Sequence, residues 1–299
     1  MPSPWQTLNF VHRPMHATRR EILRYICHRI EHLYPVQERI SIARMTAPEL
    51  EGVSFTKYLI EPDEVTTIEG LEEKVEELAQ GRPVQYVLGT AEFCDLKFRV
   101  REGVLIPRPE TEELVVWAEK CAEQFSHPRI LDLCTGSGCI AITLANHIAD
   151  SSVVGIDLSE EALVIAHENN DLIGTKVEFI KADVLGDVPQ LSVRKFDIIV
   201  SNPPYIPLSE RADMRCNVTD YEPAMALFVE DDNPLKFYRA IAAKAKKHLT
   251  KNGFLLFEIH ENLALDTTDM LREEGFIGIE IKKDFLEKPR MICCQLKRE

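Results

Sequence analysis

The sequence predicts an α/β fold of the doubly wound kind, in which a mostly parallel sheet carries helices on both faces, with a small helical domain before it. Two patterns predict this fold. Apolar residues recur at helical spacing in the first 85 residues, and extended and helical patterns alternate from residue 110 onward. A length of 299 residues suits about two domains. We therefore expect a helical domain over residues 1–85, a connector over 86–109, and the α/β domain over 110–299.

The amino-terminal domain is expected to be entirely helical. Ile22, Ile26 and Ile30 share one face of a helix over residues 17–34, and a second helix ends before Gly81. One of these helices carries His-x-x-Glu-His spacing, but nothing in its pattern indicates a third ligand, so no metal site is expected. The first acidic residue is Glu21, after Arg13, Arg19 and Arg20. This pattern resembles a targeting segment, although we favour a short frayed terminus over residues 1–16.

Short extended stretches and prolines define the connector. Phe93, Phe98 and Val104 belong to these stretches, which Pro107 and Pro109 close. This pattern predicts a β-hairpin. In the domain that follows, the expected strands are residues 129–133, 153–157, 177–181, 196–201, 254–259, 277–281 and 291–296. The expected helices are residues 111–125, 139–148, 160–169, 234–249 and one ending near residue 274.

Composition excludes several classes of function. The chain is 45% hydrophobic and 28% charged, as in ordinary globular proteins, and charges interrupt every apolar run before it could cross a bilayer. The net charge is −14, of which residues 91–299 carry −11, so a phosphate backbone would be repelled unless one face gathered the basic residues. Eight cysteines without a Cys-x-x-Cys pair are typical of a reducing compartment, and we expect a cytoplasmic protein.

A glycine-containing turn after the first predicted strand of the α/β domain is suited to a nucleotide. The strand ending at Leu133 leads into Cys134-Thr135-Gly136-Ser137-Gly138 and then directly into an apolar helix. Small residues let the chain turn sharply and let a ligand approach the backbone. Asp157 follows nineteen residues after Gly138, at the end of the next strand, where its carboxylate can accept hydrogen bonds from both hydroxyls of a ribose.

The identity of the nucleotide is not fixed by this turn alone, because Gly136, Gly138 and Ala141 also fit the looser pattern of nicotinamide enzymes. Asp132 favours S-adenosylmethionine, since a carboxylate before the loop can meet the cationic amino acid end of that cofactor but would repel a pyrophosphate. Asp183 follows a later strand and is expected beside the adenine edge, although an exposed loop carboxylate is nearly as good an interpretation.

The most informative segment is Asn202-Pro203-Pro204-Tyr205, which follows the strand over residues 196–201. Two successive prolines fix the backbone and leave its carbonyl groups free of a helix. The side-chain oxygen of Asn202 and the carbonyl of Pro203 can accept both hydrogens of a planar NH2 group, while Tyr205 covers its π-system. A planar amide nitrogen is a weak nucleophile, so alignment toward a methyl sulfonium is the principal source of rate.

Six segments together resemble the HemK/PrmC family of release-factor glutamine methyltransferases, which are class I S-adenosylmethionine enzymes. The segments are Gly81-Arg-Pro-Val-Gln-Tyr-Val-Leu-Gly89, Val104-Leu-Ile-Pro-Arg-Pro-Glu-Thr-Glu112, Leu131-Asp-Leu-Cys-Thr-Gly-Ser-Gly-Cys-Ile-Ala141, Val200-Ser-Asn-Pro-Pro-Tyr205, Glu222-Pro223 and Phe257-Glu-Ile259. The Asn-Pro-Pro-Tyr motif is shared with amino-methyltransferases that act on DNA and RNA, whereas the second segment is much more specific.

The resemblance implies methyl transfer from S-adenosylmethionine, leaving S-adenosylhomocysteine, to the glutamine nitrogen in the Gly-Gly-Gln motif of class I peptide chain release factors. It also implies which residues form the site. The cofactor contacts would be Cys134, Thr135, Gly136, Ser137, Gly138, Asp157, Asp183, Val184 and Asn202, and the glutamine would be held by Asn202, Pro203, Pro204 and Tyr205, of which Asn202, Pro203 and Tyr205 would be catalytic. The helical domain would help to dock the release factor.

Two other functions remain open. An amino-methyltransferase acting on adenine or guanine in nucleic acid would use the same four residues, and a non-catalytic nucleotide-binding module would need only Gly136, Gly138 and Asp157. We expect a monomer that binds neither nucleic acid nor a membrane. The sequence departs from the family pattern at Cys134, where glycine is usual, and at His260, which also stands where glycine is frequent. Arg108 and Glu110 are expected near the site without an assigned step, and a salt bridge within the connector is at least as good an interpretation of them.

Overall fold

The computed structural model describes residues 15–297, which form two compact units that meet in the sequence between Leu88 and Gly89. Nearly all of the segment for which we favoured a frayed terminus, residues 1–14, lies outside the described residues. None of the helices in the described part combines the length and the apolar character that crossing a bilayer requires.

The amino-terminal unit contains a two-stranded sheet as well as helices, so the prediction of an entirely helical domain is wrong. Strands β1 (Met15–Thr18) and β2 (Val65–Ile68) pair antiparallel. The sequence of β2 is Val-Thr-Thr-Ile, and four β-branched residues in succession favour a strand because their stiff side chains fit a pleated surface. The helices are α1 (Arg19–Arg29), α2 (Val36–Glu51), α3 (Phe55–Ile60), α4 (Leu71–Ala79) and α5 (Val84–Leu88).

Local signals explain the ends of these helices. The Thr18 hydroxyl accepts a hydrogen bond from the Glu21 N–H while the Glu21 carboxylate accepts one from the Thr18 N–H, a capping box that begins α1 after Thr18. Helix α1 ends at Arg29, short of the predicted residue 34, and α2 was not predicted. Gly52, in the left-handed conformation, ends α2.

The larger unit has the predicted doubly wound α/β fold. Its seven-stranded sheet has the order β12-β13-β11-β8-β5-β6-β7, in which the last five strands are parallel and β13 is antiparallel to both of its neighbours. The strands are β5 (Arg129–Leu133), β6 (Ser152–Asp157), β7 (Glu178–Lys181), β8 (Phe196–Ser201), β11 (Leu249–Glu258), β12 (Phe276–Lys283) and β13 (Pro289–Leu296).

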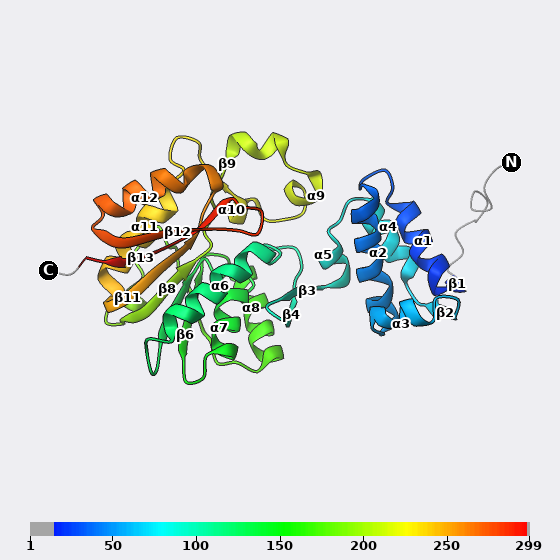
Figure 1. The fold of residues 1–299 in the computed structure, drawn as a ribbon, viewed down its shortest axis with the longest axis horizontal. Coiled ribbons are helices and arrows are strands. Elements are labelled where there is room, and N and C mark those ends of the chain that lie inside the picture. Colours follow the sequence, from blue (N-terminus) through cyan, green and yellow to red (C-terminus); the bar gives the residue numbers. More distant parts are fainter. Residues whose placement is uncertain (1–14, 298–299) are drawn as a thin grey trace. The chain divides into compact units, whose positions relative to one another are not determined.

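Helices cover both faces of this sheet (Figure 1). Ile130 and Ile198 pack with α6 and α7 on one face, whereas their neighbours Leu131 and Ile199 pack with α11 and α12 on the other. Successive strand residues point to opposite faces, and both faces must be apolar because both are covered. The helices are α6 (Pro109–Ala122), α7 (Cys139–His147), α8 (Glu160–Ile173), α11 (Lys236–His248) and α12 (Ala264–Glu273).

The connector contains the predicted hairpin, formed by β3 (Thr90–Phe93) and β4 (Leu96–Arg99). Its two turn residues, Cys94 and Asp95, both have positive φ, as in the turns whose twist matches that of a hairpin. A segment of short elements that was not predicted follows β8. It comprises β9 (Ile206–Pro207), the 3-10 helix Leu208–Asp213, α9 (Cys216–Thr219), α10 (Ala224–Leu227) and β10 (Phe228–Val229); two further 3-10 helices span Pro189–Leu191 and Glu261–Leu263.

The strand order positions three loops at one edge of the sheet. The chain passes from β5 to β6 on one side, and β8 pairs with β5 on the other, so the direction of winding reverses between β5 and β8. Leu133 is opposite Ile156 in β6 and opposite Ser201 in β8. The loops that follow Leu133, Asp157 and Ser201 therefore leave the sheet together, at the place where ligands bind in such folds.

The packing of Gly155 in β6 leads to a stability prediction. A methyl group at Gly155 would lie 2.7 Å from two ring carbons of Phe179 and 3.0 Å from Oγ1 of Thr135. We expect Gly155→Ala to lower the free energy of unfolding by about 1–3 kcal/mol, because the neighbouring strand and loop must move, as measured by urea denaturation. In the control Gly186→Ala the nearest atom would be 3.7 Å away, and the change should stay within about 0.5 kcal/mol. Equal urea midpoints for the two variants would contradict this prediction.

Candidate active site

A pocket opens at the carboxyl ends of β5, β6, β7 and β8. The space within it is about 750 Å³, part of which is open solvent at its mouth. Of the predicted site residues, the pocket is lined by Cys134, Gly136, Asp157, Asp183, Val184, Asn202 and Pro204. Thr135, Ser137, Gly138, Pro203 and Tyr205 belong to the same two loops but do not line it. The remaining wall includes Val104, Leu105, Pro223, Met225 and Phe237.

The loop after β5 turns sharply because three of its five residues have positive φ. These are Cys134 at 63°, Gly136 at 55° and Gly138 at 80°. The Thr135 N–H donates to the carbonyl of Ile156, which ties the loop to β6, and Gly138 is the N-cap of α7. Cys134 thus adopts a conformation that costs a residue with a side chain roughly 1–2 kcal/mol.

Asp157 fixes the loop from the end of β6. Its Oδ2 accepts a hydrogen bond of 2.8 Å from the Gly136 N–H, and its Oδ1 accepts one of 2.9 Å from the Ser159 N–H. Burial raises the pKa of this carboxyl, although these backbone donors act in the opposite direction. Each carboxylate oxygen has a further lone pair, so Asp157 can still accept hydrogen bonds from a ligand in the pocket.

Asp132 lies beneath the loop and not in the pocket wall. It is fully buried, its Oδ2 accepts a hydrogen bond of 2.5 Å from the Thr135 hydroxyl, and its Oδ1 has no hydrogen-bond partner in the described part of the chain. Burial raises its pKa to about 7. The expectation that Asp132 meets a cationic ligand directly is therefore not supported, because the Thr135 side chain lies against it.

Asp183 and Val184 follow β7 and line the pocket, whereas their contact with adenine stays a prediction. Val184 is buried, whereas Asp183 is exposed and its Oδ1 accepts a hydrogen bond of 2.8 Å from the Leu185 N–H. Asp157 and Asp183 thus contribute two carboxylates to the pocket wall. Two carboxylates favour a cationic ligand and disfavour a pyrophosphate.

The Asn202–Tyr205 segment leaves β8 beside the loop that begins at Cys134. The Ser201 hydroxyl donates a hydrogen bond of 2.6 Å to the carbonyl of Leu133, in addition to the pairing of the strands. Pro203 and Pro204 are both buried, and Tyr205 is partly buried. The backbone of this segment is therefore fixed by two prolines, by burial and by the end of a central strand.

Thr111 and Glu258 hold this segment. Both lie in motifs that carried the family resemblance, but neither was assigned a role. Nδ2 of Asn202 donates a hydrogen bond of 3.2 Å to Oγ1 of Thr111 in α6, and the Thr111 hydroxyl donates one of 2.6 Å to Oε2 of Glu258. The Tyr205 hydroxyl donates one of 2.9 Å to Oε1 of the same carboxylate. Burial raises the pKa of Glu258 and also that of Tyr205. The signal in the sequence was a glutamate at the end of the apolar run Leu255-Leu-Phe257.

Glu222 holds the part of the connector that lies next to the pocket. Its carboxylate is buried, accepts a hydrogen bond of 3.0 Å from the Ile106 N–H, and forms an ion pair with Arg108. Arg108 therefore has the salt-bridge role that was the alternative to a place in the chemistry. Glu110, for which no role was predicted, lies in the first turn of α6.

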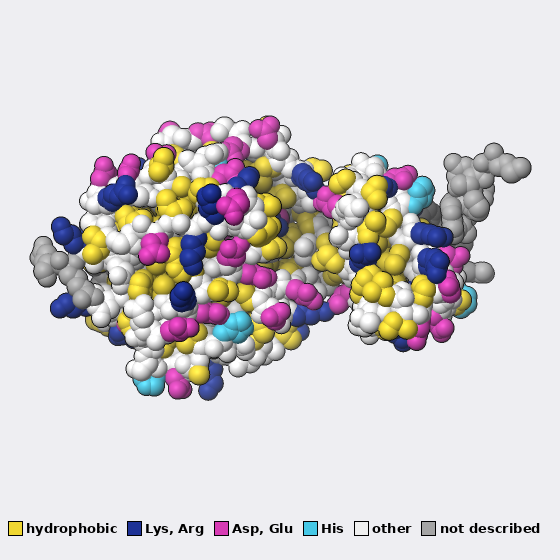
Figure 2. Space-filling view, in the orientation of Figure 1, with side chains coloured by type: hydrophobic (Ala, Val, Ile, Leu, Met, Phe, Trp, Pro, Cys, Tyr) yellow, Lys and Arg dark blue, Asp and Glu magenta, His cyan; other side chains and the backbone are white. Residues whose placement is uncertain are grey.

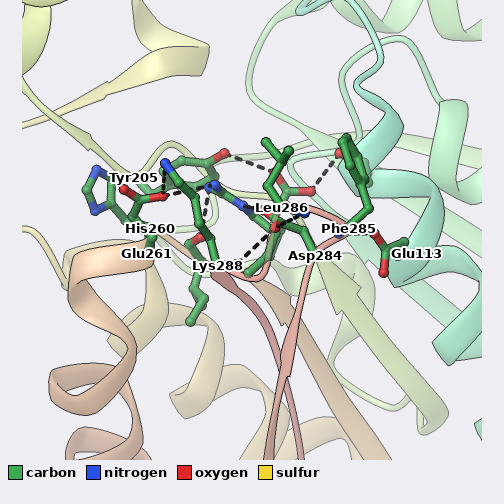
Figure 3. A network of polar contacts seen from close by, with 12 residues as sticks. Glu113, Tyr205, His260, Glu261, Asp284, Phe285, Leu286 and Lys288 are labelled. Atoms are coloured by element: carbon green, nitrogen blue, oxygen red, sulfur yellow. Dashed lines mark hydrogen bonds and ion pairs between the residues drawn. The ribbon is translucent and has the colours of Figure 1, made fainter.

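His260 follows β11 and packs against Tyr205, with the two ring centroids 6.1 Å apart in an edge-to-face arrangement. Its Nδ1 accepts a hydrogen bond from the Asn262 N–H, so Nε2 carries the proton and donates to Glu210 at 3.0 Å. Figure 3 shows both rings beside the polar network at the base of the β12–β13 turn. His260 is therefore a structural cap at a position where glycine is frequent in the family pattern.

The same network holds the β12–β13 turn. Buried Asp284 accepts hydrogen bonds from the Leu286 and Lys288 N–H groups and from Nε of Arg290, at 2.9, 3.0 and 3.1 Å. Phe285 and Leu286 at the tip are more than half exposed (Figure 3). The turn is thus fixed from within while its apolar tip faces solvent.

Cys134 provides a test of the loop conformation. We expect Cys134→Gly to change the free energy of unfolding by less than about 1 kcal/mol, because relief of the left-handed backbone offsets the added freedom of the unfolded chain. Cys134→Val should cost more than about 2 kcal/mol, since a β-branched side chain is poorly tolerated at positive φ. Urea denaturation of both variants measures the difference, and a valine variant as stable as the glycine variant would contradict the assigned conformation.

Comparison with known proteins gives consistent results. A family model described as a methyltransferase domain matches residues 124–275. The solved structure of the hMettl16 catalytic domain in complex with the MAT2A 3'UTR hairpin 6 is similar, with a TM-score of 0.52 and 14% identity over 79% of this chain and 86% of that chain, which shows the fold alone.

Curated relatives share one name. A "Release factor glutamine methyltransferase" of Bacteroides thetaiotaomicron is 38% identical over 91% of this chain and 98% of its own length. Proteins of the same name from Flavobacterium psychrophilum and Lactococcus lactis are 44% and 42% identical, over 72% and 82% of this chain and 76% and 88% of their own. On the strength of this identity over nearly the whole length, the chain belongs to the release factor glutamine methyltransferase family.

Proposed function

We propose that this protein transfers a methyl group from S-adenosylmethionine to the side-chain amide nitrogen of the glutamine in the Gly-Gly-Gln motif of class I peptide chain release factors. The observation that carries the proposal is the position of Asn202 at the end of β8, next to the loop that begins at Cys134. The relatives of this chain are named release factor glutamine methyltransferases, which agrees with it. This position brings an amide-binding group and a nucleotide pocket together at one edge of the sheet.

The residues of the pocket fit S-adenosylmethionine. Asp157 offers acceptors for the ribose hydroxyls, and the loop from Cys134 to Gly138 presents backbone to the ligand. The carboxylates of Asp157 and Asp183 suit a ligand that carries positive charge. When bound, S-adenosylmethionine supplies an electrophilic methyl group, and the product is S-adenosylhomocysteine.

The protein's own residues orient the glutamine amide. Oδ1 of Asn202 and the carbonyl of Pro203 accept its two N–H groups, and Tyr205 packs against the plane of the amide. Alignment of this kind can supply about 7–11 kcal/mol of a barrier at best. As the nitrogen loses electron density to the new bond, its hydrogens bind these two oxygens more tightly, which stabilises the transition state specifically.

Charge favours a protein substrate over nucleic acid. Residues 91–299 carry a net charge of −11. On the face that Figure 2 shows, acidic and basic side chains are interspersed and form no basic band. A nucleic-acid enzyme needs cations that neutralise phosphates. By the same family resemblance, we propose that the amino-terminal unit helps to dock the release factor and that the protein acts as a monomer.

The test uses purified full-length protein, methyl-labelled S-adenosylmethionine and a class I release factor. We expect label on the release factor, no label when the motif glutamine is replaced by alanine, and loss of at least about 100-fold in kcat for Asn202→Ala because one of the two acceptors is gone. Cofactor affinity, measured by calorimetry, should change much less. Label on transfer RNA or duplex DNA with none on the protein would instead indicate the nucleic-acid function, and failure to bind the cofactor would contradict both.

A further inference from the structure

The buried carboxylate of Glu258 lies next to the amide-binding segment, Asn202–Tyr205, and accepts hydrogen bonds from two hydroxyl groups. Glu258 is 2% exposed, and each of its oxygens accepts one hydrogen bond, from Thr111 and from Tyr205. Thr111 is equally buried, at 2% exposure, and comes from the first turn of α6. A buried carboxylate is costly unless both oxygens are satisfied, and here the two hydroxyls supply the donors.

The direction of these hydrogen bonds is fixed. A threonine hydroxyl has one proton, and that of Thr111 is directed to Glu258 at 2.6 Å. Toward any third group, Oγ1 of Thr111 can therefore act only as an acceptor. The carboxamide of Asn202 lies 3.2 Å away and must present its NH2 end to Thr111. Among residues 15–297, no hydrogen bond is donated to Oδ1 of Asn202.

We propose that Thr111 and Glu258 are positioning residues that fix the rotation of the Asn202 carboxamide, so that its oxygen and not its nitrogen is offered to the substrate. The inference rests on the proposed function, because it concerns recognition of an NH2 group. The chain of donors runs from Asn202 through Thr111 to Glu258, which is the terminal acceptor.

The consequence for the reaction follows from the chemistry of amides. The two ends of an asparagine carboxamide have almost the same shape but opposite hydrogen-bonding character. A rotated Asn202 would place its own N–H groups against those of the substrate amide, and the acceptor that must strengthen in the transition state would be missing. Without Thr111, both rotations would be available to the side chain.

The principal test compares hydroxyl removal with hydroxyl retention at residue 111. We expect Thr111→Val, which keeps the shape of the side chain, to lower kcat for release-factor methylation by roughly 10- to 100-fold, the effect of one lost hydrogen bond to a developing charge. Thr111→Ser, which keeps the hydroxyl, should stay within about threefold of the wild type. The Kd for S-adenosylmethionine should change by less than about threefold in both variants.

A matched control removes a different buried threonine hydroxyl. Thr268 in α12 is 4% exposed and donates only to the carbonyl of Ala264 in its own helix. Thr268→Val should leave kcat unchanged. If only Thr111→Val lowers kcat, the loss is not the general effect of replacing a buried threonine by valine. If Thr111→Val does not fold, as judged by circular dichroism, Thr111→Ala removes the same hydroxyl without added bulk.

Glu258→Gln tests the terminal acceptor. One of the two positions that accept hydroxyls becomes an NH2 donor, so whichever way the glutamine side chain lies, the hydrogen bond to Thr111 or to Tyr205 is reversed. We expect kcat to fall at least about fivefold with unchanged Kd for the cofactor.

The outcomes separate the two proposals. If the wild-type protein does not methylate the release factor, the proposed function fails. If the wild type is active but Thr111→Val retains its kcat, or if Thr111→Ser is as impaired as Thr111→Val, the positioning role is wrong while the proposed function stands. Unchanged kcat in Glu258→Gln would show that one uncharged acceptor at residue 258 is sufficient, and it would remove the carboxylate charge from that role.

Discussion

The parallel pairing of β5 with β8 is the constraint on which the site depends. Because Leu133 is opposite Ser201, the residues that follow them, Cys134 and Asn202, leave the sheet side by side. The Ser201 hydroxyl bonded to the Leu133 carbonyl reinforces this register at the last position where the strands pair. A shift of one residue would turn Asn202 to the opposite face of the sheet, and Cys134 and Asn202 would no longer line the same pocket.

Three carboxylates lie in or beside the loop Cys134–Gly138 and the pocket next to it. Asp132 beneath it holds Thr135, Asp157 beside it holds the Gly136 N–H, and Asp183 reaches the same pocket from β7. The proximity of like charges has an electrostatic cost. Burial is the main cause of the raised pKa of Asp132, and the neighbouring charge of Asp157 raises that pKa further. A cationic ligand would relieve part of that repulsion, whereas a dinucleotide with its pyrophosphate would add to it. The same geometry therefore both shapes the loop and selects the charge of the ligand.

Local patterns in the sequence predicted the strands of the sheet and the two loops, because alternation, glycine and proline act over a few residues. What they could not predict is which distant side chains meet. Thr111 and Glu258 are 147 positions apart, and Ile106 and Glu222 are 116 apart. Threonine in a first helical turn and glutamate at a strand end are ordinary choices, so neither attracts attention until the fold brings them together. Strand β2 is different, since its Val-Thr-Thr-Ile run was a local signal for a strand, although its pairing with the distant β1 was not.

Buried glutamates explain why segments outside the sheet can form a rigid site. Glu222 anchors the connector through a backbone N–H and an arginine, and Glu258 anchors α6 and Tyr205 through two hydroxyls. Each carboxylate is removed from water, a state that persists only when every oxygen is satisfied. Loss of any one partner therefore leaves a buried acceptor unpaired, which costs more than the hydrogen bond itself contributes. This asymmetry favours a single arrangement of the loops, and a weak amide nucleophile that depends on alignment requires a site with only one arrangement.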